Sequence, residues 1–434
     1  MYYCRKYWFG VVLVALMSAC RMQAGGTLDY TMVESKTYEY YLAKNWKELI
    51  MLSDEAFAQG IDYYYLRVRA GIATYELKRY RQSIVHFEKA LKFNEGDQLS
   101  QEYLYYAYLF SERAEDARKL SASFAPEMAA HMKTKKPEKL AYVFAEAGAK
   151  LPDSVNLYKP AIFGQVGLNH YLGRRVSFTH ALNYYLQDES RFNYTQYQYY
   201  VRGNIPLGSG LMLQAGAHLL YTNSVLKSYA IGQETVQPAP PYPGGPLPPV
   251  KTTTLLVEVD SYEKALGLVA AAGLTKQTQL FDFSISGTIY LHDSTTQYQT
   301  GAGLIFYPFR NNNTSVGFNS YLHSENKFTF SNVAIVPFVN ARLGSRFFVN
   351  ATALFNKGGN ISENMAMFVN NAYDATWNRI TLTPSYMVTP QWAVYLTAGL
   401  ETKVIKESGI NYHYMVGLVG LRFTPNKNVK KAKS

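Results

Sequence analysis

A strict alternation of apolar and polar side chains over residues 281–291 constrains this chain more than any other feature. Asp, Ser, Thr or Tyr occupies every second position, and the positions between them are apolar or glycine: Phe281, Phe283, Ile285, Gly287, Ile289 and Leu291. Successive side chains of a β-strand point to opposite faces, so this segment has one apolar and one polar face. A tilted strand needs about ten residues to cross a bilayer. Similar alternation recurs over residues 211–221 and 392–403.

A strand in lipid must have its backbone groups hydrogen-bonded by other strands, and only a closed barrel achieves this for every strand. We therefore predict an antiparallel transmembrane β-barrel. The composition agrees, because charged residues make up 17% of the chain and aromatic residues 15%, and aromatic girdles are typical of such barrels. The net charge of +11 comes from scattered basic residues without a nucleic-acid-reading motif. We expect no nucleic-acid partner.

The N-terminus has the three parts of an export signal. Arg5 and Lys6 precede an apolar stretch over residues 7–19, and small residues follow. We predict a signal peptide over residues 1–26, cleaved before Thr27. The alternative is acylation of Cys20, which lies in a sequence that resembles a lipoprotein box.

Residues 27–136 are predicted to form a helical domain. Residues 62–94 match the tetratricopeptide pattern, and weaker matches precede and follow them. Such repeats are typical interaction modules, which predicts docking of a periplasmic protein partner. The candidate docking residues are Tyr64, Tyr75 and Tyr105. The alternatives are that the helices only steady the barrel, and that these tyrosines form the core between repeats.

Turn signals divide residues 138–424 into barrel strands. The predicted strands are 158–172, 175–187, 193–206, 209–223, 261–274, 279–292, 296–307, 315–325, 332–343, 345–356, 376–388, 391–404 and 412–423. The Ala-rich segment 140–150 supplies one more strand, although its composition also suits a helix. Bacterial barrels have even strand numbers, which leaves both barrel ends of the chain in the periplasm. We therefore predict fourteen strands, with twelve as the alternative, and a basic periplasmic tail over residues 425–434.

The lengths of the connections predict which side of the membrane they occupy. Tight turns belong on the periplasmic side, and the long connections 224–259 and 357–375 belong outside. The first of these is rich in Pro over residues 238–249, which predicts a stiff, extended loop without a core of its own.

Polar side chains that face inward in this register predict a lumen and its rim. The candidates are Arg175, Arg202, His218, Asp282, Arg342, Arg379, Glu401, Lys403 and Arg422. A barrel of fourteen strands is wide enough for a narrow aqueous lumen unless something plugs it. Arginines converging on the periplasmic rim would attract phosphate, carboxylate or sulfate groups, which predicts an anionic polymer as a candidate partner. The alternative is that these arginines contact headgroups of outer-membrane lipid or acidic neighbours.

The sequence shows no catalytic arrangement. His292, Asp293 and Ser294 contain the residue types of a hydrolase triad, but adjacent strand residues point to opposite faces and cannot form one. The histidines His170, His180, His218 and His413 are isolated and show no metal-ligand spacing. We predict no enzyme activity, no cofactor and no metal site.

Two stretches resemble a known family. Residues 158–164 (Tyr-Lys-Pro-Ala-Ile-Phe-Gly), with Gly167-Leu168-Asn169-His170 and Leu172-Gly173-Arg174-Arg175, resemble the first hairpin of the YaiO-type outer-membrane barrel family. The final strand, from Gly417 to Phe423, is also similar. More loosely, the chain resembles the tetratricopeptide-barrel exporters of exopolysaccharide. The resemblance implies an outer-membrane location in a Gram-negative bacterium and a role with surface polymers.

These expectations describe an α+β multidomain protein in which tetratricopeptide-like helices precede a transmembrane barrel. The predicted function is a channel or envelope-assembly component that docks a periplasmic partner, with surface polysaccharide export as the candidate process. The alternatives are an outer-membrane scaffold that transports nothing and a barrel-borne hydrolase.

Overall fold

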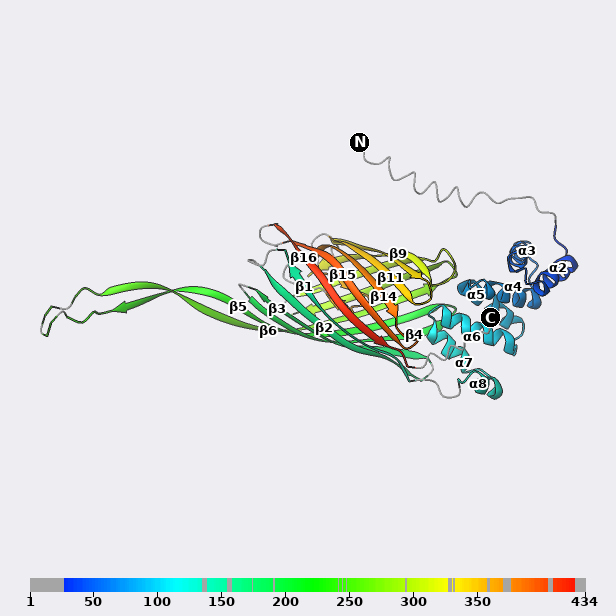
Figure 1. The fold of residues 1–434 in the computed structure, drawn as a ribbon, viewed down its shortest axis with the longest axis horizontal. Coiled ribbons are helices and arrows are strands. Elements are labelled where there is room, and N and C mark those ends of the chain that lie inside the picture. Colours follow the sequence, from blue (N-terminus) through cyan, green and yellow to red (C-terminus); the bar gives the residue numbers. More distant parts are fainter. Residues whose placement is uncertain are drawn as a thin grey trace, which may run out of the picture. The chain divides into compact units, whose positions relative to one another are not determined.

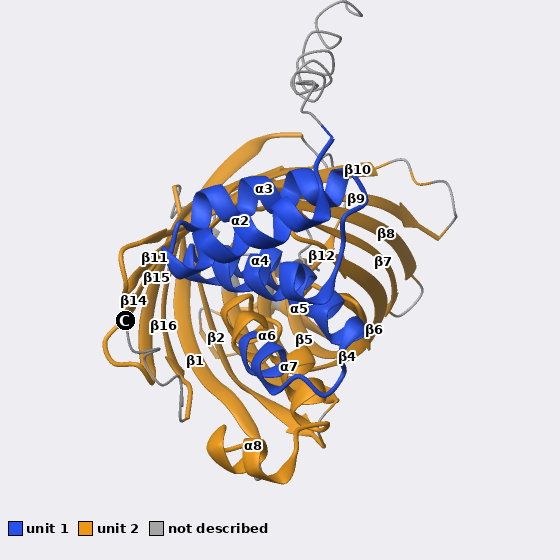
Figure 2. Ribbon diagram, turned by 90° about the vertical axis from the view of Figure 1, so that its right-hand side faces the viewer, with its two compact units in different colours: residues 1–103 blue, residues 104–434 orange. Residues whose placement is uncertain are grey.

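The computed structural model describes residues 27–134, 139–153, 158–173, 175–189, 192–240, 242–243, 245–246, 248–292, 295–326, 330, 332–356, 360–369, 376–404 and 409–425. The predicted signal peptide, nearly all of the predicted basic tail, Asp293 and Ser294 lie outside these residues. The chain divides into two compact units, residues 1–103 and residues 104–434 (Figure 2).

The predicted helical region is confirmed, and its helices recur at a constant interval. They are α2 (Tyr30–Leu42), α3 (Trp46–Ala58), α4 (Tyr64–Glu76), α5 (Tyr80–Phe93), α6 (Gln98–Phe110), α7 (Ala114–Ser121) and α8 (Pro126–His131). The first residues of α2, α4 and α6 are 34 positions apart, and so are those of α3, α5 and α7. This interval equals the tetratricopeptide period. No helix in the described part of the chain is long and apolar enough to cross a membrane.

Close packing of helices holds the first unit together. Val33, Ala56 and Leu66 form one fully buried cluster. A Cβ atom placed on Gly71 would lie 2.8 Å from the ring of Phe87. Only glycine therefore lets α4 approach α5 this closely, which is the role that the repeat pattern gives to small residues.

Two ion pairs stabilise this unit, one between α4 and the loop before it and one between α4 and α2. The Arg67 guanidinium donates to both carboxylate oxygens of Asp62 at 2.6 and 2.7 Å. Arg69 donates to Glu34 at 2.6 Å. The hydrogen bonds from these arginines lower the pKa of Asp62 and the pKa of Glu34 below their ordinary values.

The three tyrosines predicted to dock a partner lie in different settings. Tyr75 is buried, and its ring contacts the rings of Tyr80 and Tyr103, so it belongs to the core, as the alternative prediction states. Tyr64 is half-buried, and desolvation raises its pKa to about 12. Tyr105, in the second unit, packs against Phe124.

The second unit contains a closed antiparallel barrel of fourteen strands, as predicted (Figure 1). Its strands are β1 (Leu140–Pro152), β2 (Tyr158–Leu172), β3 (Val176–Glu189), β4 (Phe192–Gly208), β5 (Leu211–Val236), β6 (Lys251–Gln277), β7 (Phe281–His292), β8 (Thr295–Phe306), β9 (Thr314–Glu325), β10 (Asn332–Leu343), β11 (Phe347–Asn356), β14 (Thr376–Met387), β15 (Trp392–Val404) and β16 (Asn411–Phe423). The Ala-rich segment that begins at Leu140 is a strand, and its pairing with β16 closes the barrel.

The two faces of the barrel wall differ as the alternation predicts. Ile285 and Leu400, on the outer face, are 63% and 61% exposed. Asp282 and Glu401, on the inner face of the same strands, are almost fully buried. An apolar exterior over a closed hydrogen-bonded wall is the arrangement that lipid requires, so the barrel spans a membrane. We call the end where β1 begins and β16 stops the terminal end, and the opposite end the loop end.

The helical part of the second unit contacts the terminal end of the barrel. Ser177 at the start of β3 donates to Glu115 of α7 at 2.7 Å. Arg118 of α7 donates to the carbonyl of Gly173 at 3.0 Å and covers the ring of Tyr171. These contacts tie α7 to the turn between β2 and β3.

The prediction of a long loop over residues 224–259 is wrong for most of its length. β5 and β6 pair without interruption from Leu211 opposite Lys276 to Val236 opposite Lys251. Their described pairing with β4 and β7 stops at Leu226 and Gly267, so a two-stranded ribbon continues beyond the barrel (Figure 1). Residues 252–259 are rich in Thr and Val, which favour strands, while the prolines are confined to residues 238–249.

Glycines at two turns predict different costs of substitution. Gly210 has φ +75°, and an added Cβ would collide with the backbone carbonyl of Gln277. Gly173 has φ +62° but open space around it. We expect Gly173→Ala to cost about 1 kcal/mol, from the left-handed conformation alone. Gly210→Ala should lower the midpoint of thermal unfolding clearly more than Gly173→Ala does. The midpoint is the temperature at which the protein loses the electrophoretic mobility of its folded form. Equal midpoints for the two variants would contradict this.

Candidate functional site: the lumen and its inserted hairpin

A short hairpin from the connection between β11 and β14 lies inside the barrel. Residues 360–369, here called the lumenal hairpin, contain β12 (Ser362–Glu363) and β13 (Phe368–Val369), which pair with each other. Ile361 and Ala366 are 1% and 0% exposed. The sequence predicted the extracellular side for this connection, which joins β11 and β14 at the loop end, but it did not predict that part of the connection enters the barrel. The apolar residues of the hairpin explain the outcome, because in solvent they would remain unburied.

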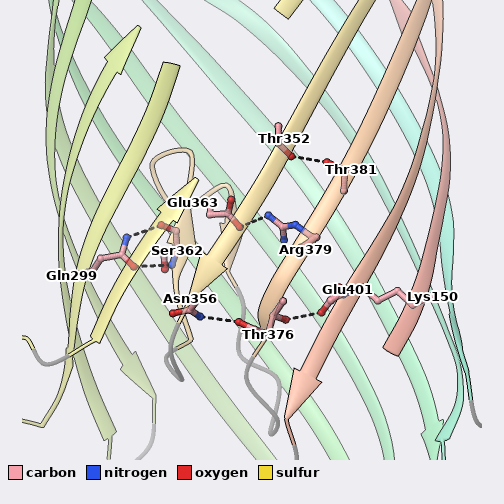
Figure 3. Close-up of polar contacts among 10 residues, drawn as sticks. All are labelled: Lys150, Gln299, Thr352, Asn356, Ser362, Glu363, Thr376, Arg379, Thr381 and Glu401. Carbon is pink, nitrogen blue, oxygen red and sulfur yellow. Dashed lines mark hydrogen bonds and ion pairs between the residues drawn. The ribbon is translucent and has the colours of Figure 1, made fainter. Parts of the chain in front are cut away.

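Polar side chains of the wall hold the first strand of the lumenal hairpin (Figure 3). Gln299 of β8 donates to the carbonyl of Ser362 at 2.6 Å and accepts from its backbone N–H at 3.0 Å. Arg379 of β14 forms an ion pair with Glu363 at 2.7 Å. Figure 3 shows Gln299 and Arg379 reaching the hairpin from opposite sides. These contacts satisfy backbone and charged groups that would otherwise be costly to bury.

The turn of the hairpin is held by β4 and β5. His218 contacts the carbonyl of Ala366 through Nδ1 at 2.6 Å. Tyr200 donates to the carbonyl of Met365 at 3.1 Å, and Arg202 donates to the side chain of Asn364 at the same distance. Sequence-predicted lumen residues therefore do meet, but around a segment of the chain itself.

An apolar cluster of the barrel wall, here called the apolar seat, contacts the turn of the lumenal hairpin. Ala366 packs with Leu220, Val269 and Tyr290, and Met365 packs against the same cluster. A Cβ atom placed on Gly273 would lie 3.0 Å from the sulfur of Met365. Glycine on β6 thus leaves the space that the Met365 side chain occupies.

The turn of the hairpin is strained. Asn364, Met365 and Ala366 have φ angles of 51°, 56° and 63°. Asn tolerates the left-handed conformation, whereas it costs roughly 1–2 kcal/mol for each of Met365 and Ala366. The contacts with the wall offset this cost, so the turn depends on the barrel for its conformation.

A second polar cluster lies beside the hairpin (Figure 3). Glu401 of β15, 1% exposed, accepts from Lys150 of β1 at 2.7 Å and from Thr376 at 2.6 Å, and Lys403 lies 4.0 Å away. Arg379 is directly opposite Glu401 in the strand register. The cluster therefore places three cations, Lys150, Lys403 and Arg379, around Glu401 and Glu363.

Three of the remaining candidates, Asp282, Arg342 and Arg422, contact neighbouring residues of the barrel. Asp282 is buried and accepts from Tyr307 at 2.9 Å. Arg342 donates to the carbonyls of Gly344 and Ser345 in its own turn. Arg422 lies over the ring of Tyr142, and Arg175 lies exposed in a turn.

Arg202, Arg342 and Arg422 make different contacts: with Asn364 of the lumenal hairpin, with the carbonyl of Gly344 and with the ring of Tyr142. Their convergence at the periplasmic rim stays a prediction. Among the described residues, no three His, Cys, Asp or Glu side chains gather as a metal site.

Sequence reasoning missed Ser362 and Glu363, which the wall residues hold. A signal was present, because the long connection predicted on the extracellular side contains Ile361, Met365, Met367, Phe368 and Val369. Such an apolar segment needs a surface to cover it.

Comparisons with known proteins give only distant likenesses. No protein-family model matches the chain, and no curated protein matches its sequence. A solved CymD monoaromatic hydrocarbon channel is 9% identical with a TM-score of 0.38, covering 70% of this chain and 93% of that one. The toluene transporter TodX of P. putida is 9% identical with a TM-score of 0.39, over 69% of this chain and 94% of that one. A bacterial polysaccharide outer membrane secretin is 10% identical with a TM-score of 0.36, over 67% and 99%. Likenesses this distant assign neither a family nor a function, and the resemblance to YaiO-type barrels stays a prediction.

Proposed function

We propose that this protein is an outer-membrane channel whose conductance is set by the lumenal hairpin. The observation that carries the proposal is a strained hairpin, inside a closed barrel, held through Gln299, Arg379 and His218. A hairpin with two short strands can leave the wall as a unit, because its backbone pairing is its own. The barrel wall is complete without it.

The charges beside the hairpin support anionic cargo. While the hairpin is in place, the Arg379 guanidinium is in an ion pair with Glu363. When the hairpin leaves, Lys150, Lys403 and Arg379 surround the single carboxylate of Glu401. A local excess of cations favours a carboxylate, sulfate or phosphate group of a passing polymer. Surface polysaccharide export is the process we propose for such a channel.

The helical region supplies the second half of the proposal. Helix pairs at a 34-residue interval suit docking of a partner in the periplasm. Tyr64 and Tyr105 are the proposed docking residues, since Tyr75 is buried in the core. This placement puts the terminal end of the barrel on the periplasmic side.

Ion selectivity in planar bilayers tests the channel. In a potassium chloride gradient, we expect the reversal potential of the wild type to show a preference for chloride. Arg379→Gln should reduce that preference, because it removes the cation that the hairpin releases. Arg342→Gln is the matched control, since that guanidinium donates to the carbonyls of Gly344 and Ser345 and lies over the ring of Phe348, away from the hairpin contacts of Arg379.

A second candidate function is a scaffold that transports nothing. The density of contacts on the hairpin favours it, because the ion pair, the Gln299 bonds and the apolar seat all oppose release. Absence of conductance in both the wild type and hairpin-release variants would establish the scaffold and overturn the channel.

A further inference from the structure

Two histidines on neighbouring strands meet on the outer face of the barrel. β2 and β3 pair so that His170 lies opposite Phe178 and Leu168 lies opposite His180, which makes the histidines diagonal neighbours. Both face outward, because Asn169 and Thr179, the adjacent residues, are buried on the inner face. The prediction that these two histidines are isolated is therefore wrong.

The distance between the two rings suits a shared metal ion. The Nε2 atoms of His170 and His180 are 3.1 Å apart. Imidazole nitrogen binds zinc at about 2.0–2.1 Å, so two nitrogens on one ion are about 2.9 Å apart at a right angle and about 3.3–3.4 Å apart in a tetrahedron. The observed separation lies between these values.

Without a metal, the same pair makes one hydrogen bond in which one ring donates and the other accepts. The rings are inclined by only 8°. Metal binding therefore requires a tilt of the rings that aims both lone pairs at one point. The χ2 torsion of histidine is broad enough to permit this, and the strands need not move.

Neighbouring side chains orient the pair. Nδ1 of His180 lies 2.8 Å from the hydroxyl of Tyr199 on β4. If Nδ1 carries the proton and donates to that oxygen, the lone pair of the ring is at Nε2, which is the usual outer-shell support of a metal-binding histidine. Phe178 stacks on His170 at 5.7 Å between centroids. Three hydrogen-bonded strands thus present two oriented nitrogen ligands.

We propose that His170 and His180 bind one first-row transition-metal ion of the copper, nickel and zinc group on the outer face of the barrel. Neutral imidazole nitrogens favour these ions over calcium and magnesium, which prefer oxygen ligands. Neither histidine is buried, and Tyr199 is 42% exposed, so an ion can reach the pair. Water or phosphate oxygens of lipid headgroups fill the other coordination positions. The ion links β2 to β3 near the terminal end of the barrel.

The test uses the full chain in detergent micelles, made without a polyhistidine tag and stripped of metal by a chelator. Titration with Cu²⁺ should give one tightly bound ion per chain, with an electron paramagnetic resonance spectrum that shows two nitrogen ligands. His170→Ala and His180→Ala should each remove this binding step. Tyr199→Phe should weaken binding about tenfold, since it removes the outer-shell oxygen.

His413→Ala is the matched control, because His413 also faces outward on the barrel, and its Nδ1 contacts Thr402 at 3.0 Å. It should bind Cu²⁺ like the wild type. His170→Leu gives an apolar outer surface and serves as a second variant if the alanine form folds poorly. Unchanged binding in folded His170 variants, a single-nitrogen spectrum, or equal competition by Ca²⁺ would overturn the site. Each outcome is independent of whether the barrel conducts.

Discussion

The double variant Gln299→Ala, Glu363→Ala is expected to raise the open probability of the channel by about 100-fold. These changes remove the two hydrogen bonds on Ser362 and the ion pair with Arg379. Neutral hydrogen bonds contribute about 0.5–1.5 kcal/mol and charged ones about 1.5–3 kcal/mol. A combined loss of about 3 kcal/mol shifts the closed-to-open ratio about 100-fold. The two contacts involve adjacent residues, so their separate effects need not add.

Single-channel recording in planar bilayers measures the open probability. Thiol labelling measures release of the hairpin from the wall independently. Cys4 and Cys20 are the only cysteines of the chain. A form in which both are replaced and Ala366→Cys is added reports release, because Ala366 is fully buried in the seat. The control is Thr352→Val, Thr381→Val, which removes a 2.6 Å hydrogen bond of the wall. Faster labelling without higher conductance would show that the hairpin is not the barrier to ion flow through the barrel.

Glu401→Ala is expected to destabilise the barrel by about 3–5 kcal/mol, the cost of leaving buried charges without their partner. Glu401 forms an ion pair with Lys150 at 2.7 Å, and its carboxylate lies 4.0 Å from the ammonium group of Lys403. Without it, the ammonium group of Lys150 loses the carboxylate that it contacts on the inner face of the wall. Glu401→Gln keeps the shape and an acceptor for Thr376 but loses the charge, so its effect should be intermediate.

The urea midpoint of the refolded protein, read from tryptophan fluorescence, measures this loss. Glu234→Ala provides the control, because Glu234 is an exposed acidic residue of the same unit, outside the barrel wall. It should shift stability by less than about 0.5 kcal/mol. A Glu401→Ala midpoint indistinguishable from that of Glu234→Ala would show that the lysines are not held by this carboxylate.

The parts of the fold that depend on local pattern could be predicted. Alternation placed thirteen strands and their faces, and even the Ala-rich segment at Leu140 formed the predicted strand. The extension of β5 and β6 beyond the barrel was missed, because the prolines at residues 238–249 suggested that the flanking residues also belong to a loop. Proline ends a strand only where it occurs, and the flanking Thr and Val residues continue the pairing.

The candidate site was predicted in pieces. Arg379, His218 and Glu401 were identified as inward residues, but their partners were not. The position of the lumenal hairpin is set by packing between segments far apart in the chain, such as Ala366 with Val269. The contact of His170 with His180 depends on a diagonal register between β2 and β3 that spacing alone does not give.

The uninterrupted pairing of β5 and β6 means that closure of the wall does not need an intact polypeptide between them. A protease that cuts within residues 237–250 leaves Leu211 to Leu226 bonded to β4 on one side and to β6 on the other. Two fragments would then remain together as one cylinder and separate only in hot detergent. The chain could be divided there into two genes, one supplying the five strands β1–β5 and the other the remaining nine strands of the barrel.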